Sequence, residues 1–405
     1  MKDEFNKGAL YLLALTSVGS VFNYASQIAM GRIFSVEAFG RINVMFSFIY
    51  ILIVLGNGLN QLASKMIAIS SGYLKNVRII AFTLTVVVSV TLVFLQRFIG
   101  GFLGIDSNLV LWSSFVIVAL FYISLTLIGC LSGMKKFVAV GFLNLIMPAL
   151  RFFGVGVVFL LSIPMRFQEN FVLLFMIFGL LITILIAWII LRVSLKQPRV
   201  DSSESTLERS FVNSTIAILA ISLLFAVYSN ADLLLINLLF GETVAGEYSS
   251  AMLFGRMIFF LVTTLSMVML PMVAAKSGDI QGSQSYLKKG LGFAVVISIV
   301  IVFPVVVLRD FLIVTLFGDG FVHASVYVVY ACAIAISLSL ISVTYNYLIG
   351  MGRYRVLIIS FVFGIVGVII AAVFAVEVTA LLLSLILVFA SVAVLNIFVC
   401  FWRIK

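Results

Sequence analysis

The chain has 405 residues, of which 64% are hydrophobic and only 10% charged, and its mean hydropathy is +1.30. Soluble domains carry about 25% charged residues, so this composition excludes a soluble globular protein and predicts an all-α, polytopic membrane protein. Three isolated cysteines and a single histidine predict neither a disulfide framework nor a metal site.

The first two hydrophobic segments, residues 8–30 and 42–62, are predicted to form a hairpin of spanning helices, because a span needs about 20 apolar residues. Polar residues spaced by three or four share one face of the first helix: Thr16, Ser20, Asn23 and Gln27. The second segment carries a similar group before it ends at Lys65: Asn57, Asn60, Gln61 and Ser64. Both groups are predicted to face a shared polar interior rather than lipid. Hydrogen bonding between packed helices is the alternative.

Ten further apolar segments raise the predicted number of spans to twelve, near residues 77–97, 108–130, 137–161, 170–193, 212–240, 247–275, 288–309, 322–350, 355–376 and 378–402. The connections on one side hold 18 of the 25 basic residues and those on the other side only five. Because basic loops stay in the cytoplasm, both termini are predicted to be cytoplasmic. The net charge of +10 then reflects topology and contact with anionic lipids, and no nucleic-acid partner is expected.

One long polar segment near the midpoint divides the chain into two halves of six predicted helices. The predicted organisation is an N-terminal lobe over 1–193, a cytoplasmic linker over 194–211 and a C-terminal lobe over 212–405. Phe34 to Gly40 recurs as Phe240 to Gly246, an offset of 206 residues, each time between the first and second helices of its half. Since six is an even number, the two copies are predicted to be parallel repeats around a central cavity.

Four charged residues lie within or at the ends of spans: Arg32, Arg151, Asp232 and Arg256. A charge at the bilayer centre costs about 2.5–3.5 kcal/mol on the most lenient scale, so such groups usually face a partner or a wet cavity. Snorkelling of the arginines to the interface is the alternative. Asp232 and Arg256 lie twelve residues on either side of a turn near Val244, which predicts the same depth and an ion pair between them.

Motifs of hydrolases, metalloproteases and nucleotide-binding enzymes are missing from the sequence, so an enzyme is not expected. Several segments instead resemble the polysaccharide lipid-carrier flippases of the multidrug/oligosaccharidyl-lipid/polysaccharide exporter superfamily: Gly31-Arg32-Ile33-Phe34 through Phe39-Gly40, the helix end from Asn57 to Lys65, Asp232 to Ile236, Gly246 to Ala251, and Leu270-Pro271. The resemblance implies two six-helix lobes and alternating access. It also implies a cargo of oligosaccharide repeat units on undecaprenyl diphosphate, moved from the cytoplasmic to the periplasmic leaflet of the bacterial inner membrane for O-antigen, capsule or exopolysaccharide assembly.

Under this resemblance the candidate substrate-binding residues fall into two chemical groups. Arginine presents a planar fork that suits phosphate oxygens, so the diphosphate is expected to meet Arg32, Arg151 and Arg256. Lys65 is added to this group, although many relatives carry arginine there. Neutral amides supply donors and acceptors for sugar hydroxyls, so the sugars are expected to meet Asn23, Gln27, Asn57 and Gln61.

Asp232 is the candidate for ion coupling, with H⁺ or Na⁺ as the coupling ion and no other cofactor. Possible partners are a polysaccharide polymerase and the chain-length machinery. The lipid II flippase has additional C-terminal helices that this sequence lacks, which argues against a peptidoglycan precursor as cargo.

Two rival functions remain open. A multidrug exporter of the same fold would typically carry acidic residues in the first helix, whereas none lies between Glu4 and Glu37. A membrane polysaccharide polymerase would typically have a large external loop, whereas the predicted external connections are short.

Overall fold

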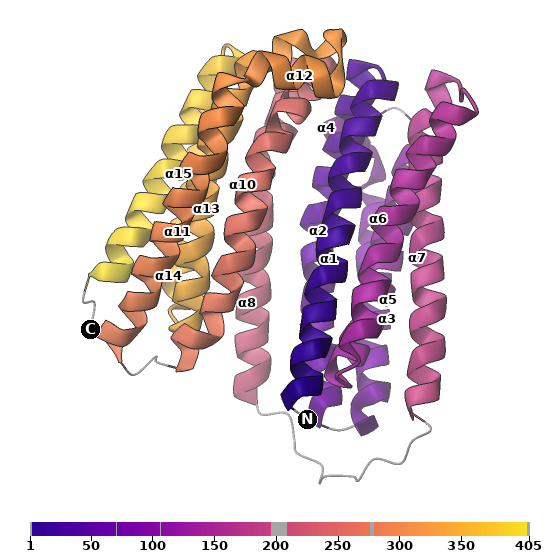
Figure 1. Cartoon of the computed structure of the whole chain (residues 1–405), viewed down its shortest axis with the longest axis vertical. Helices are drawn as coiled ribbons and strands as arrows, with labels where there is room; N and C mark the ends of the chain where they lie inside the picture. Colours follow the sequence, from indigo (N-terminus) through magenta and orange to yellow (C-terminus); the bar gives the residue numbers. More distant parts are fainter. Residues whose placement is uncertain (1, 70, 106, 196–208, 276–278, 403–405) are drawn as a thin grey trace. The chain divides into compact units, whose positions relative to one another are not determined.

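The computed structural model describes residues 2–69, 71–105, 107–195, 209–275 and 279–402, and these residues form helices joined by short connections (Figure 1). The helices of the first half are α1 (Lys2–Ile33), α2 (Val36–Ile69), η1 (Ser71–Tyr73), α3 (Leu74–Phe94), α4 (Gln96–Leu103), α5 (Asn108–Gly133), α6 (Phe137–Leu160) and α7 (Met165–Leu195). Those of the second half are α8 (Arg209–Tyr228), α9 (Ala231–Phe240), α10 (Glu242–Ala275), α11 (Ile280–Val307), α12 (Arg309–Phe317), η2 (Asp319–Ala324), α13 (Ser325–Gly350), α14 (Tyr354–Val373) and α15 (Val378–Phe401).

The all-helical membrane class is confirmed. Within the described residues, ten helices are long and apolar enough to span a membrane, and α8 with α9 makes an eleventh if this bent pair is one span. Eleven of the twelve predicted spans therefore correspond to these helices, with the bent pair taken as one. The remaining one, predicted over residues 8–30, lies within α1, a helix of 32 residues.

The chain folds into two compact units. Unit 1 comprises residues 1–35 and 45–219, and unit 2 comprises 36–44 and 220–405. Most of each predicted lobe lies in one unit, but the first residues of α2 belong to unit 2 although the remainder of that helix belongs to unit 1. Much of the predicted linker, residues 196–208, lies outside the described residues.

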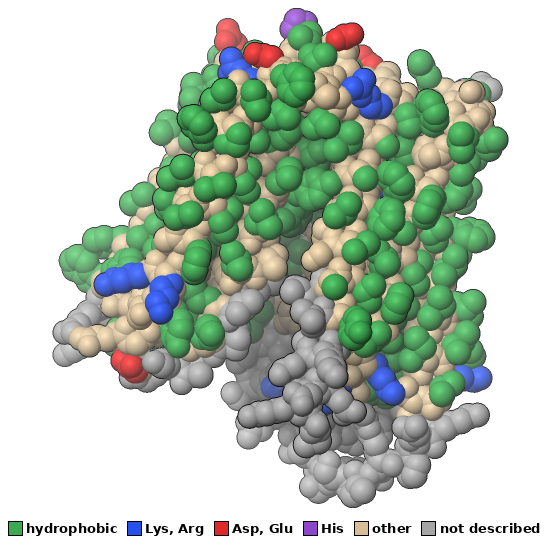
Figure 2. Space-filling view, viewed as in Figure 1, with side chains coloured by type: hydrophobic (Ala, Val, Ile, Leu, Met, Phe, Trp, Pro, Cys, Tyr) green, Lys and Arg blue, Asp and Glu red, His purple; other side chains and the backbone are tan. Residues whose placement is uncertain are grey.

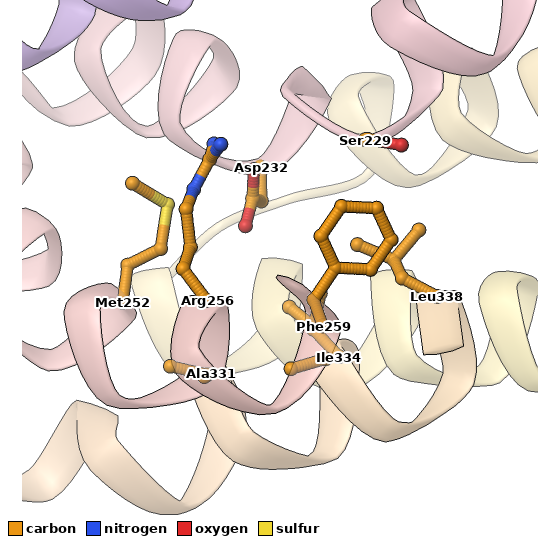
Figure 3. A pocket seen from close by; sticks show the side chains of 10 residues that line it. Ser229, Asp232, Met252, Arg256, Phe259, Ala331, Ile334 and Leu338 are labelled. Atoms are coloured by element: carbon orange, nitrogen blue, oxygen red, sulfur yellow. The ribbon is translucent and has the colours of Figure 1, made fainter. Parts of the chain in front are cut away.

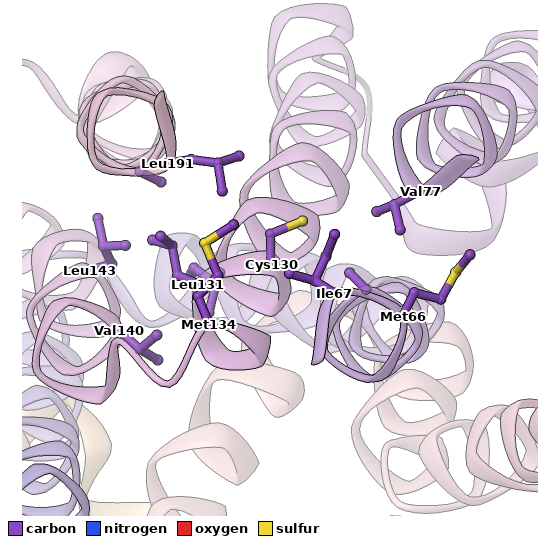
Figure 4. Packing of buried hydrophobic residues seen from close by; sticks show 12 residues of the cluster. Met66, Ile67, Val77, Cys130, Leu131, Met134, Val140, Leu143 and Leu191 are labelled. Atoms are coloured by element: carbon purple, nitrogen blue, oxygen red, sulfur yellow. The ribbon is translucent and has the colours of Figure 1, made fainter. Parts of the chain in front are cut away.

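Unit 1 is held together by apolar side chains that five of its helices contribute to one cluster (Figure 4). Leu131 of α5 and Ala63 of α2 have no exposed surface, and Leu191 of α7 is only 1% exposed. Because lipid solvates apolar side chains as well as a protein interior does, these contacts stabilise the unit through close van der Waals packing. This packing fixes the positions of α2, α5, α6 and α7, and α1 packs on α6.

Unit 2 is organised around the pair α10 and α13. Gly255 of α10 lies so close to α13 that an added Cβ would be 2.6 Å from the carbonyl oxygen of Ala331, so only glycine permits this approach. Further along both helices, hydrogen bonds join four polar side chains of the pair: Thr263, Ser266, Ser342 and Asn346. The other elements of unit 2 pack around this pair, and α12 lies across the ends of the long helices (Figure 1).

The repeated glycines of the sequence motif contact each other within unit 2. Gly40 near the start of α2 packs on the backbone of Glu242 and Gly246, and a Cβ on Gly246 would clash with the backbone of Val36. Around this crossing the Nη1 of Arg41 donates to Oε2 of Glu242 at 2.6 Å. The motif therefore places the starts of two pseudo-equivalent helices, α2 and α10, in backbone contact.

The surface follows the pattern of a protein solvated by lipid. Figure 2 shows hydrophobic side chains along the sides of the helices and the visible charged side chains near the helix ends. Exposed phenylalanines such as Phe94 (84%) and Phe303 (71%) lie on this apolar surface. Water would not favour so much exposed apolar area, whereas hydrocarbon accepts it.

Candidate functional site

A break between α8 and α9 creates the main polar site of unit 2. The predicted single helix over 212–240 is wrong here, because the axis bends by 43° between Tyr228 and Ala231. Two side chains at the break bond to the preceding turn: Ser229 Oγ donates to the carbonyl of Phe225 at 2.7 Å and Asn230 Nδ2 donates to that of Ala226 at 2.7 Å. Such side chains compete with backbone N–H groups for the helical carbonyls. The break directs the side chain of Asp232 toward the interior of unit 2.

A small cavity lies beside this break, lined by residues of α9, α10 and α13 together with Ser229 (Figure 3). Its volume of about 20 Å³ is sufficient for a single water molecule. Asp232 and Arg256 reach it from facing helices, and most of the other lining residues are apolar.

Asp232 is held by two neutral donors. The side chain is only 3% exposed. Its Oδ1 accepts the backbone N–H of Leu233 at 2.9 Å, and its Oδ2 accepts the hydroxyl of Tyr248 at 2.7 Å. Since Tyr248 is itself fully buried, both the position and the orientation of the carboxyl group are fixed by packing.

The predicted ion pair between Asp232 and Arg256 is not present. No nitrogen of Arg256 lies within 4.0 Å of the Asp232 carboxyl oxygens; instead Arg256 Nη2 donates to Oδ1 of Asn230 at 2.8 Å. The reason is the break before α9, which presents the Asn230 amide to the guanidinium. The depth prediction is sound, because both side chains line one cavity, but the hydrogen bond goes to the neutral neighbour.

Arg151 forms the polar centre of unit 1. It lies on α6, is 1% exposed, and donates from Nε to Ser26 Oγ at 2.9 Å and from Nη2 to the carbonyl of Asn23 at 3.1 Å. Its guanidinium carbon lies 5.1 Å from the ring centre of Phe46, which is cation–π distance. Nη1 is buried and has no hydrogen-bond partner among the described residues. Arg151 is thus buried between helices, and the snorkelling alternative does not apply to it in this structure.

The other candidate residues are more accessible. Arg32, Lys65, Asn57 and Gln61 are exposed, and Asn23 and Gln27 are half-buried. Within the part of the chain that the structure describes, Asn23 is hydrogen-bonded to Arg151, through its backbone carbonyl rather than its amide side chain.

Comparison with known proteins places the sequence in a family. The family model described as polysaccharide biosynthesis protein matches residues 5–277, more than half of the chain. The chain belongs to the polysaccharide biosynthesis protein family. No curated protein matches it.

This family member has the fold of multidrug-and-toxin (MATE) transporters of the MOP superfamily. An inward-facing multidrug resistance MATE transporter superposes with a TM-score of 0.74 at 13% identity, covering 97% of each chain. A MOP superfamily transporter from Pyrococcus furiosus, described as having a binding pocket of reverse polarity, superposes with a TM-score of 0.71 at 14% identity, covering 98% of this chain and 94% of the other. Identities this low establish the fold alone. They show that the chain has the fold that the resemblance seen in the sequence implied.

Three residues of the two sites were missed by sequence reasoning on this polysaccharide biosynthesis protein: Ser26, Asn230 and Tyr248. Ser26 had a signal, because the repeat offset of 206 residues pairs it with Asp232. Asn230 follows Ser229 inside an otherwise apolar run, which is a helix-break signal. Tyr248 has no sequence signal that separates it from any other tyrosine in a span.

Proposed function

We propose that this polysaccharide biosynthesis protein is a flippase that moves undecaprenyl-diphosphate-linked oligosaccharide repeat units from the cytoplasmic to the periplasmic leaflet by alternating access coupled to an ion. The observation that carries the proposal is the combination of a polysaccharide-biosynthesis sequence with the fold of a transporter superfamily. Glycans assembled on a lipid carrier must cross the membrane with a diphosphate that hydrocarbon does not solvate. A protein with a transporter fold in such a pathway would give the diphosphate a route across the membrane.

The two kinds of candidate residue suit the two parts of the cargo. Buried Arg151 has an unpartnered Nη1 and is the strongest candidate for a phosphate oxygen, with exposed Arg32 and Lys65 as groups the lipid headgroup reaches first. Asn23, Gln27, Asn57 and Gln61 supply amides to the sugars. Arg256 is a weaker phosphate candidate, because the cavity it borders has room for about one water molecule.

The location, orientation and partners of the protein follow from the same proposal. The protein would lie in the bacterial inner membrane with both termini cytoplasmic, in contact with anionic lipids, and would deliver its product to a polymerase and the chain-length machinery. Single cysteines at Ser203 and at exposed Thr243 test the orientation. Only the second should react with an impermeant thiol reagent in intact cells, and reaction at Ser203 alone would reverse the orientation.

The activity is tested in proteoliposomes that hold a fluorescent undecaprenyl-diphosphate oligosaccharide. Purified protein should expose the sugar to an added glycosidase on the opposite face, whereas Arg151→Lys, which keeps the charge but loses the fork, should be slower. In cells, deletion should strand lipid-linked repeat units on the cytoplasmic leaflet and remove surface glycan. Equal sugar exposure in protein-free vesicles would contradict the proposal.

A multidrug exporter is the second candidate, favoured by the likeness to multidrug resistance MATE structures. The sequence of the first helix does not favour this function, because no carboxylate lies between Glu4 and Glu37 to bind a cationic drug. Unchanged surface glycan together with increased drug sensitivity in the deletion strain would favour this function.

A further inference from the structure

The turn between α5 and α6 in unit 1 has a structural counterpart between α13 and α14 in unit 2. In each turn two consecutive backbone N–H groups donate to carbonyls of the preceding helix, in the pattern of a Schellman C-cap: Lys135 to Ser132 and Lys136 to Leu131, and Gly352 to Ile349 and Arg353 to Leu348. The two turns are therefore copies of one element, and their side chains can be compared position by position.

The comparison shows that Lys135 occupies a glycine position. Its φ is 61°, and that of its counterpart Gly352 is 70°. This left-handed conformation suits glycine, because a Cβ makes it less stable. The backbone of the turn thus gains nothing from a lysine, and the side chains of Lys135 and Lys136 are both exposed.

The end of α7 brings a third cation to the same end of unit 1. Arg192 directly follows Leu191, and the two lysines directly follow Met134; Leu191 and Met134 belong to one buried cluster (Figure 4). The guanidinium carbon of Arg192 lies 4.1 Å from the ring centre of Trp188, which is cation–π distance. The indole therefore holds this charge at the surface of the helix.

The protein supplies no counter-charge to these cations within the part of the chain that the structure describes. No carboxylate oxygen there lies within 4.0 Å of Lys135, Lys136 or Arg192. Helices α5 and α6 contain no acidic residue, and Glu169 of α7 lies in the second turn, at the other end of that helix. An anion from outside the chain is the remaining source of neutralisation.

The surroundings of Arg192 identify the kind of anion. The preceding turns of α7 expose apolar side chains at helical spacing: Leu181 (47%), Leu185 (56%), Trp188 (40%) and Ile189 (48%). In a membrane protein such a face contacts acyl chains rather than water. The cations therefore lie where a lipid presents its phosphate, and the apolar face lies where the same lipid presents its chains.

We propose that Lys135, Lys136, Arg192 and Trp188 form a binding site for the headgroup phosphate of an anionic phospholipid whose acyl chains lie along the exposed face of α7. The lipid joins the α5–α6 turn to the end of α7 and stabilises the folded protein, because it binds the native state. Under the orientation proposed above, it belongs to the cytoplasmic leaflet, where anionic lipids attract basic segments.

Thermal unfolding of the purified full-length protein in a neutral detergent tests the site. Added phosphatidylglycerol should raise the melting temperature of the wild type, and phosphatidylcholine should not. Lys135→Gly should change two quantities in opposite directions. Without lipid its melting temperature should rise by about 2–4 °C, because the left-handed strain is relieved. Its affinity for phosphatidylglycerol should fall about fivefold, the contribution of one cation near a membrane surface.

Two further variants separate a defined site from overall charge. Arg192→Gln should weaken phosphatidylglycerol binding about as much as Lys135→Gly does. Lys75→Gln removes the charge of an exposed lysine at the start of α3 and should bind phosphatidylglycerol as the wild type does. Equal stabilisation by both phospholipids, or equal weakening in all three variants, would overturn the inference.

The lipid carrier of the proposed cargo is the competing ligand. Stabilisation by undecaprenyl diphosphate and not by phosphatidylglycerol, lost in Lys135→Gly and Arg192→Gln, would assign these cations to the cargo and overturn the inference. None of these measurements involves flipping, so failure of the proposed function is distinguishable from failure of this site.

Discussion

The two units bury different polar groups around corresponding positions of the repeat. The offset of 206 residues pairs Ser26 with Asp232 and Phe46 with Met252. In unit 1, Ser26 and Phe46 surround the buried cation Arg151. In unit 2, Asp232 supplies a buried carboxyl group, and Met252 lines the cavity beside it.

This difference shows how a duplicated helix framework acquires two chemistries. The hydroxyl of Ser26 accepts from a guanidinium that arrives from α6, whereas Asp232 accepts from Tyr248 on α10. Arg151 has no carboxylate within 4.0 Å among the described residues. Unit 1 therefore buries a cation with one unpartnered N–H group, whereas unit 2 buries a carboxyl group that two neutral donors hold.

The largest effect is expected from reversing the charge of unit 1. Arg151→Glu would place a carboxylate against the hydroxyl of Ser26 and the carbonyl of Asn23, with no cation nearby. An uncompensated buried charge costs about 3–5 kcal/mol, which consumes much of the stability of a typical domain. Yield and melting temperature in detergent should fall sharply. The control is Arg32→Glu at an exposed position. A normal melting temperature for Arg151→Glu would show that water reaches the site and solvates the introduced carboxylate.

Removing the charge should separate function from stability. Arg151→Met keeps an apolar side chain of similar length, and Ser26 Oγ already donates to the Asn23 carbonyl at 2.8 Å, so no buried acceptor is orphaned. Hydrophobic replacement of buried charges is often neutral or stabilising by about 1–4 kcal/mol. We expect flipping to be lost while the melting temperature stays equal or rises. Retained flipping would exclude Arg151 from cargo binding.

How far the sequence predicts this molecule depends on which interactions are local. Helix positions follow from runs of apolar residues, and the superfamily from residues spread over the chain. The repeat motif also anticipated the Gly40 and Gly246 pair, although not their mutual contact. The site was only partly predictable. Sequence reasoning placed Asp232 and Arg256 at one depth but missed the break at Asn230 that redirects the guanidinium, because side-chain competition with the helical backbone is decided by tertiary packing. Likewise, no pattern connects Arg151 with Ser26, which is 125 positions away.

A smaller effect distinguishes the charge state of unit 2. Tyr248→Phe removes the hydroxyl that donates to Asp232 at 2.7 Å. The loss should be about 0.5–1.5 kcal/mol if Asp232 is neutral and about 1.5–3 kcal/mol if it is ionised. We expect the larger value at neutral pH, because both carboxyl oxygens of Asp232 accept hydrogen bonds, as those of a carboxylate do. A double-mutant cycle with Asp232→Asn measures the coupling directly, and the smaller value would show that Asp232 is neutral in this conformation.

The smallest stability effect is expected at Asn23. Arg151 bonds to the backbone carbonyl of this residue, and the carbonyl is retained in Asn23→Ala. The free energy of unfolding should therefore change by less than about 0.5 kcal/mol, as for substitutions away from buried networks. Flipping should nevertheless slow if the amide contacts sugar hydroxyls, because a sugar left without its partner loses a hydrogen bond of about 0.5–1.5 kcal/mol. Ser26→Ala is the matched comparison, since it removes the acceptor of Arg151 Nε and should lower stability as well as flipping. If Asn23→Ala destabilises the protein as much as Ser26→Ala does, the Asn23 side chain supports the fold of unit 1 and is not a sugar contact.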